Sequence, residues 1–103
     1  MITFVEDRKF TEAAVRLLGD NELLALMQKL ATTPDAGDVI PQSGGCRKLR
    51  IAAKGKGSRG GARVVYFHRS NAGEILLLDL YAKSDKTNLS SAELKILKSK
   101  VKS

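Results

Sequence analysis

The residues of this chain best suited to chemistry are cations gathered in one third of the sequence. No acidic residue lies between Asp38 and Glu74, whereas the same stretch holds eight basic residues. The rest of the chain carries ten basic and eleven acidic residues, so all of the net charge of +7 arises in that stretch. A cluster of cations without counter-ions favours a polyanionic partner, above all nucleic acid. The eight residues are Arg47, Lys48, Arg50, Lys54, Lys56, Arg59, Arg63 and Arg69.

The sequence offers few ligands or nucleophiles besides these cations. A single cysteine, Cys46, excludes an internal disulfide, and with one histidine, His68, it leaves too few ligands for structural zinc. Cys46 begins a predicted strand without a histidine nearby, so we expect a small buried residue rather than a nucleophile. His68 alternates in phase with Val64 and Tyr66, which favours a core or edge histidine over a general base. No carboxylates are paired for glycoside hydrolysis or clustered for magnesium, so any catalysis would be metal-free, without a cofactor, and carried by cations, with a tyrosine as a further candidate.

The glycine-rich segment 54–61 matches two known loop patterns only superficially. Residues 55–60 satisfy the G-x-G-x-x-G pattern of dinucleotide-binding loops, which requires a helix after its last glycine. Here a strand near Arg63 follows instead. A Walker loop is excluded as well, because Gly61 stands where its lysine must be. We expect a cationic hairpin loop whose glycines allow close approach to an RNA backbone.

Hydrophobic periodicity predicts a strand, two helices, three antiparallel strands and a final helix, an α+β order. The first helix carries an apolar stripe and stops at Gly19, after which Asp20 is the expected cap of the second. Pro34 ends that helix, and residues 90–93 fit a capping box for the last one. The polar segment 34–45 is expected to be a connecting loop, and residues 70–73 are expected to form a hairpin turn. The expected strands are residues 2–5, 46–53, 62–69 and 74–81, and the stripe is Phe10, Ala13, Ala14, Leu17 and Leu18.

Strand alternation assigns the cations of the three long strands to defined faces. The first of them has a cationic face with Lys48, Arg50 and Lys54, and on the second Arg63 lies in phase with Val65. Hairpin pairing is expected to bring these polar positions onto one basic surface with at least one aromatic ring. On the third strand the polar residues Asp79, Tyr81 and Lys83 lie in phase with Ile75 and Leu77.

The length and composition are those of one compact soluble domain spanning residues 1–103. The longest apolar run, from Ile75 to Leu78, is far too short to cross a bilayer. The first ten residues hold an acidic pair and no apolar segment, which argues against a signal peptide. A single cysteine fits a reducing compartment, so we expect a cytoplasmic protein without membrane contacts.

Two signatures in this chain resemble the RelE/HigB toxins of bacterial type II toxin–antitoxin modules. Residues 45–66 look like the central signature of these toxins, and residues 80–91 resemble the one that follows the last long strand. Residues 37–40 also resemble the HigB-type subgroup. The resemblance implies a RelE-like, microbial-ribonuclease-like fold with an antiparallel sheet, an N-terminal helical hairpin and a C-terminal helix. It further implies an endoribonuclease that enters the ribosomal A site, cuts mRNA there and inhibits translation.

The resemblance also implies roles for individual residues. The basic pair of the family's first hairpin strand falls on Lys48 and Arg50. Its phosphate-contacting arginine falls on Arg63, and the basic residue after the last strand falls on Lys83. Some relatives carry a tyrosine beyond that point, where this chain has Leu89. This departure leaves the general base open.

Tyr81, Tyr66 and a lysine are the substitutes available for that base, and we include Tyr81 in the expected catalytic set. Metal-free cleavage uses the RNA 2′-hydroxyl as its nucleophile, so the protein must orient the phosphate, stabilise charge and move two protons. A second set of cations is expected to grip ribosomal RNA rather than perform chemistry. That set is Arg47, Lys54, Lys56 and Arg59.

The implied partners are mRNA, the ribosome with its small-subunit RNA, and a cognate antitoxin. The antitoxin is expected to carry a helix-turn-helix domain and to bind the operator DNA. Two alternatives stay open: a ParE-like toxin that poisons DNA gyrase by protein binding, and an RNA-binding module without catalysis. The clustered cations favour RNA over gyrase, and ribosome-dependent cleavage of an mRNA separates the three functions.

Overall fold

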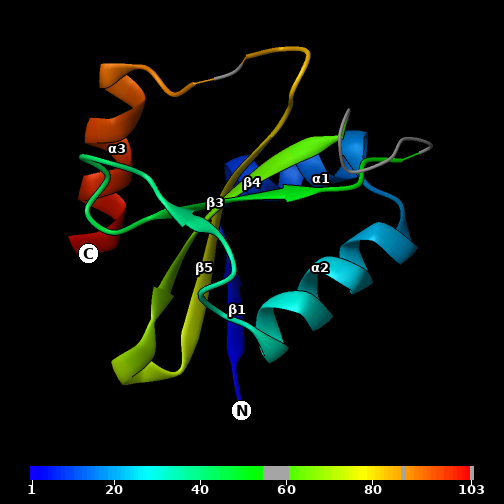
Figure 1. The fold of residues 1–103 in the computed structure, drawn as a ribbon, viewed down its shortest axis with the longest axis horizontal. Coiled ribbons are helices and arrows are strands. Elements are labelled where there is room, and N and C mark those ends of the chain that lie inside the picture. The colour runs from blue at the N-terminus through cyan, green and yellow to red at the C-terminus, as the bar shows by residue number, and fades with distance from the viewer. Residues whose placement is uncertain (55–60, 87, 103) are drawn as a thin grey trace.

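The computed structural model describes residues 1–54, 61–86 and 88–102. Five strands form one sheet in the order β1-β5-β4-β3-β2, with α1 and α2 on one face and α3 on the other (Figure 1). None of the helices in these ranges is long and apolar enough to cross a membrane. The strands are β1 (Thr3–Glu6), β2 (Asp38–Val39), β3 (Arg47–Ile51), β4 (Ala62–Arg69) and β5 (Glu74–Ala82), and the helices are α1 (Arg8–Leu17), α2 (Asp20–Thr32) and α3 (Ser91–Lys102), with a 3-10 turn at Ser70–Ala72.

This architecture confirms the predicted α+β fold and adds two details to its sheet. β1 runs parallel to β5, with Thr3 opposite Glu74, whereas the other strand pairs are antiparallel. The sheet is therefore mixed. The short strand β2 lies in a polar segment from which we expected only a loop, and it pairs with Arg47 and Lys48. Two residues are too few to carry a strand periodicity that a sequence reader can detect.

The helices α1 and α2 cover one face of the sheet through apolar side chains at the predicted spacing. Phe10 of α1 is fully buried, as is Leu30 of α2, and both belong to one core cluster with residues of β4 and β5. On the sheet side, Val64 and Tyr66 of β4 and Leu77 of β5 are completely buried among them. We call this assembly the α1–α2 core.

The ends of the helices lie close to the predicted positions, with one change of cap. Gly19, not Asp20, is the N-cap of α2, and its N–H donates to the Glu22 carboxylate at 2.8 Å. Asp20 is instead the first helical residue, where its charge interacts favourably with the helix dipole. The capping box of α3 forms as predicted, because Ser90 and Glu93 exchange hydrogen bonds between backbone N–H groups and side chains.

The helix α3 covers the other face of the sheet around Leu97. This side chain packs with Cys46, Val65 and Leu78, a group that we call the α3 core. Cys46 is fully buried, and burial raises the pKa of its thiol to about 11. The expectation of a small buried residue is confirmed, and the raised pKa disfavours the thiolate, which is the reactive form of cysteine.

A β-bulge interrupts the pairing of β4 with β5. Val65 lies opposite Asp79, whereas the next residue, Tyr66, lies opposite Leu77. Leu78 is therefore the extra residue of β5. A bulge places two consecutive side chains on one side of a strand, and here strict alternation stops at Leu78.

The bulge corrects our assignment of faces on β5. Ile75 and Leu77 precede it and pack in the α1–α2 core, whereas Tyr81 follows it and packs in the α3 core. The expectation that Asp79, Tyr81 and Lys83 share a face with Ile75 and Leu77 is therefore wrong for Tyr81. The bulge moves this ring to the side of the sheet that carries the cations of β3 and β4.

Candidate functional site

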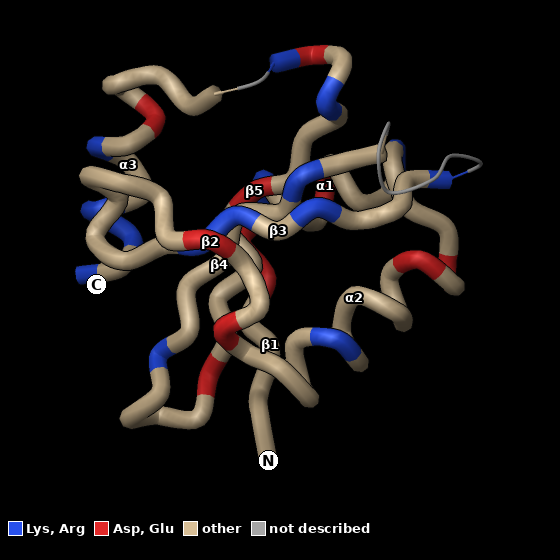
Figure 2. The backbone as a smooth tube through the Cα atoms, viewed as in Figure 1, with Lys and Arg blue, Asp and Glu red and all other residues tan. Residues whose placement is uncertain are grey.

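Basic side chains from two neighbouring strands lie on one face of the sheet. Arg50 of β3 is the register partner of Arg63 of β4, and Arg63 is that of Tyr81 of β5, so the three residues form a row. Lys48 lies two residues from Arg50 and projects to the same side. Figure 2 shows the basic segments of β3 and β4 side by side. We call Lys48, Arg50 and Arg63 the cationic face.

The cationic face lies on the α3 side of the sheet. Leu49 packs against the α1–α2 core, so its neighbours Lys48 and Arg50 project to the opposite side. Val65 is buried in the α3 core, and Arg63, two residues earlier, shares its side. Arg50 is exposed, while Lys48 and Arg63 are half-buried. The sheet therefore brings together four of the five residues expected to be catalytic, with Tyr81 as the fourth.

No member of the cationic face forms an ion pair with a carboxylate in residues 1–54, 61–86 and 88–102, although Asp38 of β2 lies opposite Lys48 in the sheet register. Arg63 Nη1 donates to the Ala62 carbonyl at 3.1 Å. Asp79, one strand away, is contacted instead by Lys9 at 3.4 Å and Lys86 at 4.0 Å. A basic surface without such ion pairs attracts an external anion.

Tyr81 closes one end of the row with a buried hydroxyl. Only 5% of the residue is exposed, and its hydroxyl has no hydrogen-bond partner in the described part of the protein. Burial raises the pKa of the phenol, and the nearby Arg63 charge opposes that shift. The ammonium of Lys86 lies 4.8 Å from the ring centroid. A neutral phenol in this position is a hydrogen-bond donor rather than a base.

Tyr66 lies away from the cationic face, although we considered it as a base. Its ring is fully buried in the α1–α2 core, and its hydroxyl accepts a hydrogen bond from the Gly37 N–H at 2.9 Å. A Cβ added at Gly37 would lie 2.9 Å from the Lys48 carbonyl oxygen and 3.0 Å from a Tyr66 ring carbon. Glycine is therefore required at position 37. The hydrogen bond from its N–H to the Tyr66 hydroxyl fixes the start of β2, which follows Gly37 directly.

Arg47 also points away from the cationic face. Its guanidinium donates to the Gly37 carbonyl at 2.7 Å and lies 3.6 Å from the Asp35 carboxylate. His68 Nδ1 lies 2.9 Å from the same carboxylate, and this hydrogen bond is the main cause of the lowered pKa of Asp35. Arg47 and His68 thus hold the segment between α2 and β2. His68 lies at the edge of the core, as its strand parity predicts.

Two of the remaining predicted cations, Lys54 and Lys83, lie just beyond the ends of β3 and β5. Lys54 is exposed, and its backbone N–H donates to the Leu17 carbonyl at 2.8 Å. Lys83 is exposed where β5 ends, and its N–H donates to the Gly61 carbonyl at 3.2 Å. Lys56 and Arg59 lie outside the described residues.

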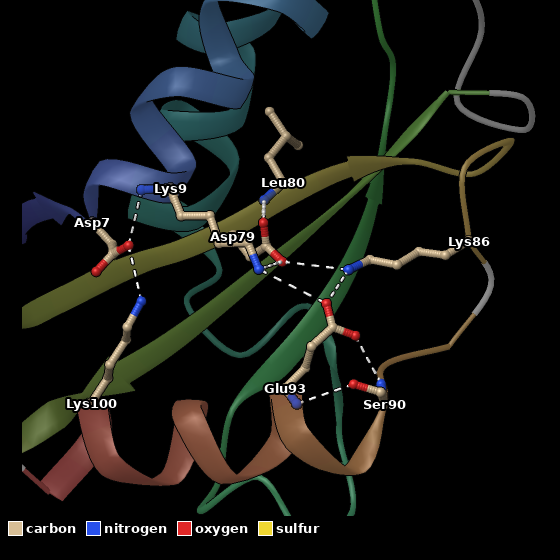
Figure 3. Close-up of polar contacts among 8 residues, drawn as sticks. All are labelled: Asp7, Lys9, Asp79, Leu80, Lys86, Ser90, Glu93 and Lys100. Carbon is tan, nitrogen blue, oxygen red and sulfur yellow. Dashed lines mark hydrogen bonds and ion pairs between the residues drawn. The ribbon is translucent and has the colours of Figure 1, made fainter.

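A network of four charged side chains ties α3 to the sheet and to α1, and sequence reasoning missed it. Lys86 forms an ion pair with Glu93 and reaches Asp79, which Lys9 of α1 also contacts (Figure 3). The Lys86 contact and the capping hydrogen bond from Ser90 hold the pKa of Glu93 at about 2. The four residues come from separate elements, so no pattern within one stretch of the sequence predicts that they meet. The network holds α3 next to β5, because Lys86 contacts both Glu93 of α3 and Asp79 of β5.

The sheet order, the cationic face and the flanking helices can now be compared with known proteins. Residues 5–103 match the family described as the RelE toxin of the RelE / RelB toxin-antitoxin system. The chain belongs to this RelE toxin family. The match covers nearly the whole chain, including every residue of the cationic face.

A solved structure of the same fold is the crystal structure of the isolated E. coli RelE toxin. It aligns with a TM-score of 0.57 over 96% of this chain and 98% of that chain, at 15% sequence identity. At this identity the likeness shows the fold alone. The RelE-like architecture expected from the sequence is therefore confirmed, while the roles of individual residues are not carried over by this comparison.

The resemblance places Leu89 where some relatives are expected to carry a tyrosine, and its surroundings in this chain explain an apolar residue. The side chain is half-buried and packs against the α3 core. It precedes the capping box of α3, as a hydrophobic residue commonly does at that position. Within the described residues, no group of three or more His, Cys, Asp or Glu side chains comes together to hold a metal ion.

Proposed function

We propose that this RelE-family chain is a ribosome-dependent endoribonuclease that cuts mRNA in the ribosomal A site. The observation that supports the proposal most directly is the cationic face, where three basic side chains on adjacent strands lack carboxylate partners in the described part of the chain. An RNA backbone supplies the missing negative charge. Toxins of this family are generally ribosome-dependent ribonucleases, which supports the same function.

The proposed reaction needs no nucleophile from the protein. The 2′-hydroxyl of the RNA attacks the adjacent phosphorus, and the bond from phosphorus to the 5′-oxygen of the next nucleotide breaks. The 2′-hydroxyl loses its proton to a base, and the departing 5′-oxygen receives one from an acid. The products are a cyclic phosphate and a free 5′-hydroxyl, so the protein must hold the phosphate and move two protons.

Each member of the site is suited to one of these tasks. Arg63 is half-buried and presents a planar guanidinium, which suits the phosphate oxygens in the transition state, with Arg50 opposite it. Proton transfer is assigned to Lys48 and Lys83, because guanidinium groups keep their protons. Tyr81 is assigned as a neutral donor to a phosphate oxygen, and because its hydroxyl is buried and without a partner in the described structure, substrate binding has to expose it first.

Cleavage of a translated message tests this function. Purified protein is added to bacterial ribosomes translating a defined mRNA, and primer extension maps the cuts. We expect cuts within the A-site codon that require the ribosome. Absence of cleavage together with arrest of DNA gyrase would favour the ParE-like alternative. RNA binding without cleavage or gyrase inhibition would favour the non-catalytic RNA-binding module.

The partners of the chain follow from the same proposal. A RelB-type antitoxin is implied by the family, and we propose that it neutralises the toxin and carries a helix-turn-helix domain that binds the operator DNA. We further propose that the chain belongs to the HigB-like subgroup and acts in the bacterial cytoplasm on the ribosome, through small-subunit RNA. Expression alone is expected to arrest bacterial growth, and co-expression of the neighbouring open reading frame is expected to restore it.

A further inference from the structure

A pocket with a volume of about 580 Å³ opens beside the cationic face. It lies between the segment 38–42, which includes β2, and residues 88–94, which lead into α3. Lys48 belongs both to the cationic face and to the wall of this pocket. A strand of RNA held by the cationic face would therefore pass its mouth. Most of the wall is apolar and is formed by Val39, Ile40, Pro41, Leu89 and Leu94.

Three polar side chains line the same pocket, and all three are exposed. They are the carboxylate of Asp38 and the amides of Gln42 and Asn88. In the described ranges of the chain, none of the three side chains has a hydrogen-bond or ion-pair partner, so their polar atoms are free to bind a ligand. Apolar walls and a few free polar groups are the composition of a site for a flat heterocyclic ring.

We propose that this pocket binds one unpaired base of the RNA whose phosphates lie on the cationic face. The proposal rests on the function proposed above and names the part of the substrate that the site reads. Proteins that recognise single-stranded RNA take splayed bases between apolar side chains and hydrogen-bond their edges. The Asp38 carboxylate is an acceptor only, so it favours a base with an exocyclic amino group. Adenine, cytosine and guanine carry such a group, whereas uracil offers only its ring N3–H as a donor.

The backbone conformation at Gln42 allows its side chain to be removed from the pocket without straining the turn. Gln42 has a φ of 62°, in the left-handed region that glycine adopts without strain. Gln42→Gly therefore removes the amide and keeps the turn. Asp38→Asn exchanges the acceptor for a group that also donates. Asp20→Asn, at the exposed start of α2, is a matched control outside the pocket.

The first experiment measures base preference. Messages that differ only in the base at one position of the A-site codon are translated, and cleavage is quantified for the wild type and the three variants. At one codon position, we expect the wild type to cut the amino-bearing bases at least about fivefold faster than uracil, the lower end of one base contact. Asp38→Asn should reduce this ratio by a similar factor, Gln42→Gly should reduce it further or alter the order of bases, and Asp20→Asn should retain the wild-type ratio. Identical ratios in the wild type and both pocket variants would overturn the proposal.

The second experiment measures RNA binding without ribosomes and without cleavage. Trinucleotides that carry 2′-deoxyribose at the cleavage position cannot be cut, and their binding is followed by NMR of the Leu89 and Leu94 methyl groups and the Gln42 side-chain amide. We expect shifts at these groups that weaken when uracil replaces an amino-bearing base. If the wild type cuts no message but these shifts appear, the nuclease function fails and the pocket stands. Shifts confined to other parts of the protein would overturn the pocket.

Discussion

Arg50 and Arg63 lie directly opposite each other on β3 and β4, so two guanidinium groups share one side of a strand pair. Like charges at opposing positions destabilise a strand pair. No carboxylate of the described residues pairs with either arginine. The free protein therefore carries a repulsion that a bound phosphate would remove.

The first prediction is that inorganic phosphate stabilises the protein through this pair. Phosphate at about ten times its Kd adds about 1.4 kcal/mol to the free energy of unfolding, because it binds only the native state. That gain raises the Tm by several degrees in a domain of this size. Arg50→Gln should raise the Tm of the free protein and shrink the response to phosphate, measured at constant ionic strength. An equal response in wild type and variant would show that phosphate binds elsewhere.

A second prediction separates chemistry from binding at Arg63. If its guanidinium stabilises charge in the transition state, Arg63→Ala lowers the rate of ribosome-dependent cleavage by roughly 10²-fold or more. Arg63→Lys should recover only part of the loss, because a point charge does not reproduce the planar fork. Ribosome binding should change far less. Arg69→Ala, on the same strand, is the control, and near wild-type cleavage by a folded Arg63→Ala protein would remove Arg63 from the site.

The third prediction concerns the cations of segment 54–61. If Lys54, Lys56 and Arg59 contact ribosomal phosphates, affinity for ribosomes falls steeply as salt rises. Replacing all three with alanine should weaken binding and lower the slope of log affinity against log salt by roughly three, or about one for each lost phosphate contact. Sedimentation with ribosomes at several salt concentrations measures this slope. An unchanged slope would count against this segment as an RNA contact.

The fourth prediction compares the two buried tyrosine hydroxyls. Tyr66→Phe leaves the buried Gly37 N–H without its acceptor, so the free energy of unfolding should fall by about 1–3 kcal/mol. Tyr81→Phe removes a hydroxyl that has no partner in the described structure, so stability should stay unchanged or rise. Urea unfolding of both variants gives the comparison. The same Tyr81→Phe protein tests the assigned donor, because its cleavage rate should fall while its stability does not.

The fifth prediction is a loss of stability in acid through Glu93. Its pKa is about 2 in the folded protein and 4.5 as an unperturbed group, so the folded state favours the ionised form. Stability from this group is fully present above pH 4.5 and is lost as the pH falls from there to about 2. Urea unfolding between pH 2 and pH 6 should show a smaller pH dependence for Glu93→Gln than for the wild type. Glu12→Gln, in an exposed pair with Arg8, should retain the wild-type dependence.

The parts of the fold that the sequence predicted are those with local signals. The apolar stripe of α1, the capping box of α3 and the hairpin turn before β5 each lie within one stretch of chain, and all three form as expected. The pairing of β1 with β5 joins residues about seventy positions apart, and no pattern in either strand predicts that the two run parallel as neighbours. The two-residue strand β2 depends on tertiary contacts, chiefly those of Gly37 and Arg47.

The candidate site was predictable in its composition and less so in its geometry. Strand parity placed Lys48, Arg50 and Arg63 on one face, because β3 and the first half of β4 alternate without interruption. Arg47, which we counted with the RNA-binding set, has the opposite parity to Lys48 and Arg50 and lies on the other face. Its guanidinium is held by Asp35 and Gly37. Tyr81 was assigned to the wrong face for a different reason, since the pairing shift at Leu78 has no sequence signature of its own.

That shift at Leu78 divides β5 into two segments with opposite phase. The residues before it are constrained by the packing of α1, and those after it deliver Tyr81 to the side that carries Arg63. Loss of the single residue Leu78 would restore a regular ladder in which Leu77 still lies opposite Tyr66 and Asp79 opposite Val65, so the Tyr81 ring would keep its place beside Arg63. A one-residue deletion in the middle of a buried strand would thus leave the cationic face and Tyr81 in place and remove only the packing of Leu78 in the α3 core, whereas a regular β5 of the same length would turn Tyr81 into the interior.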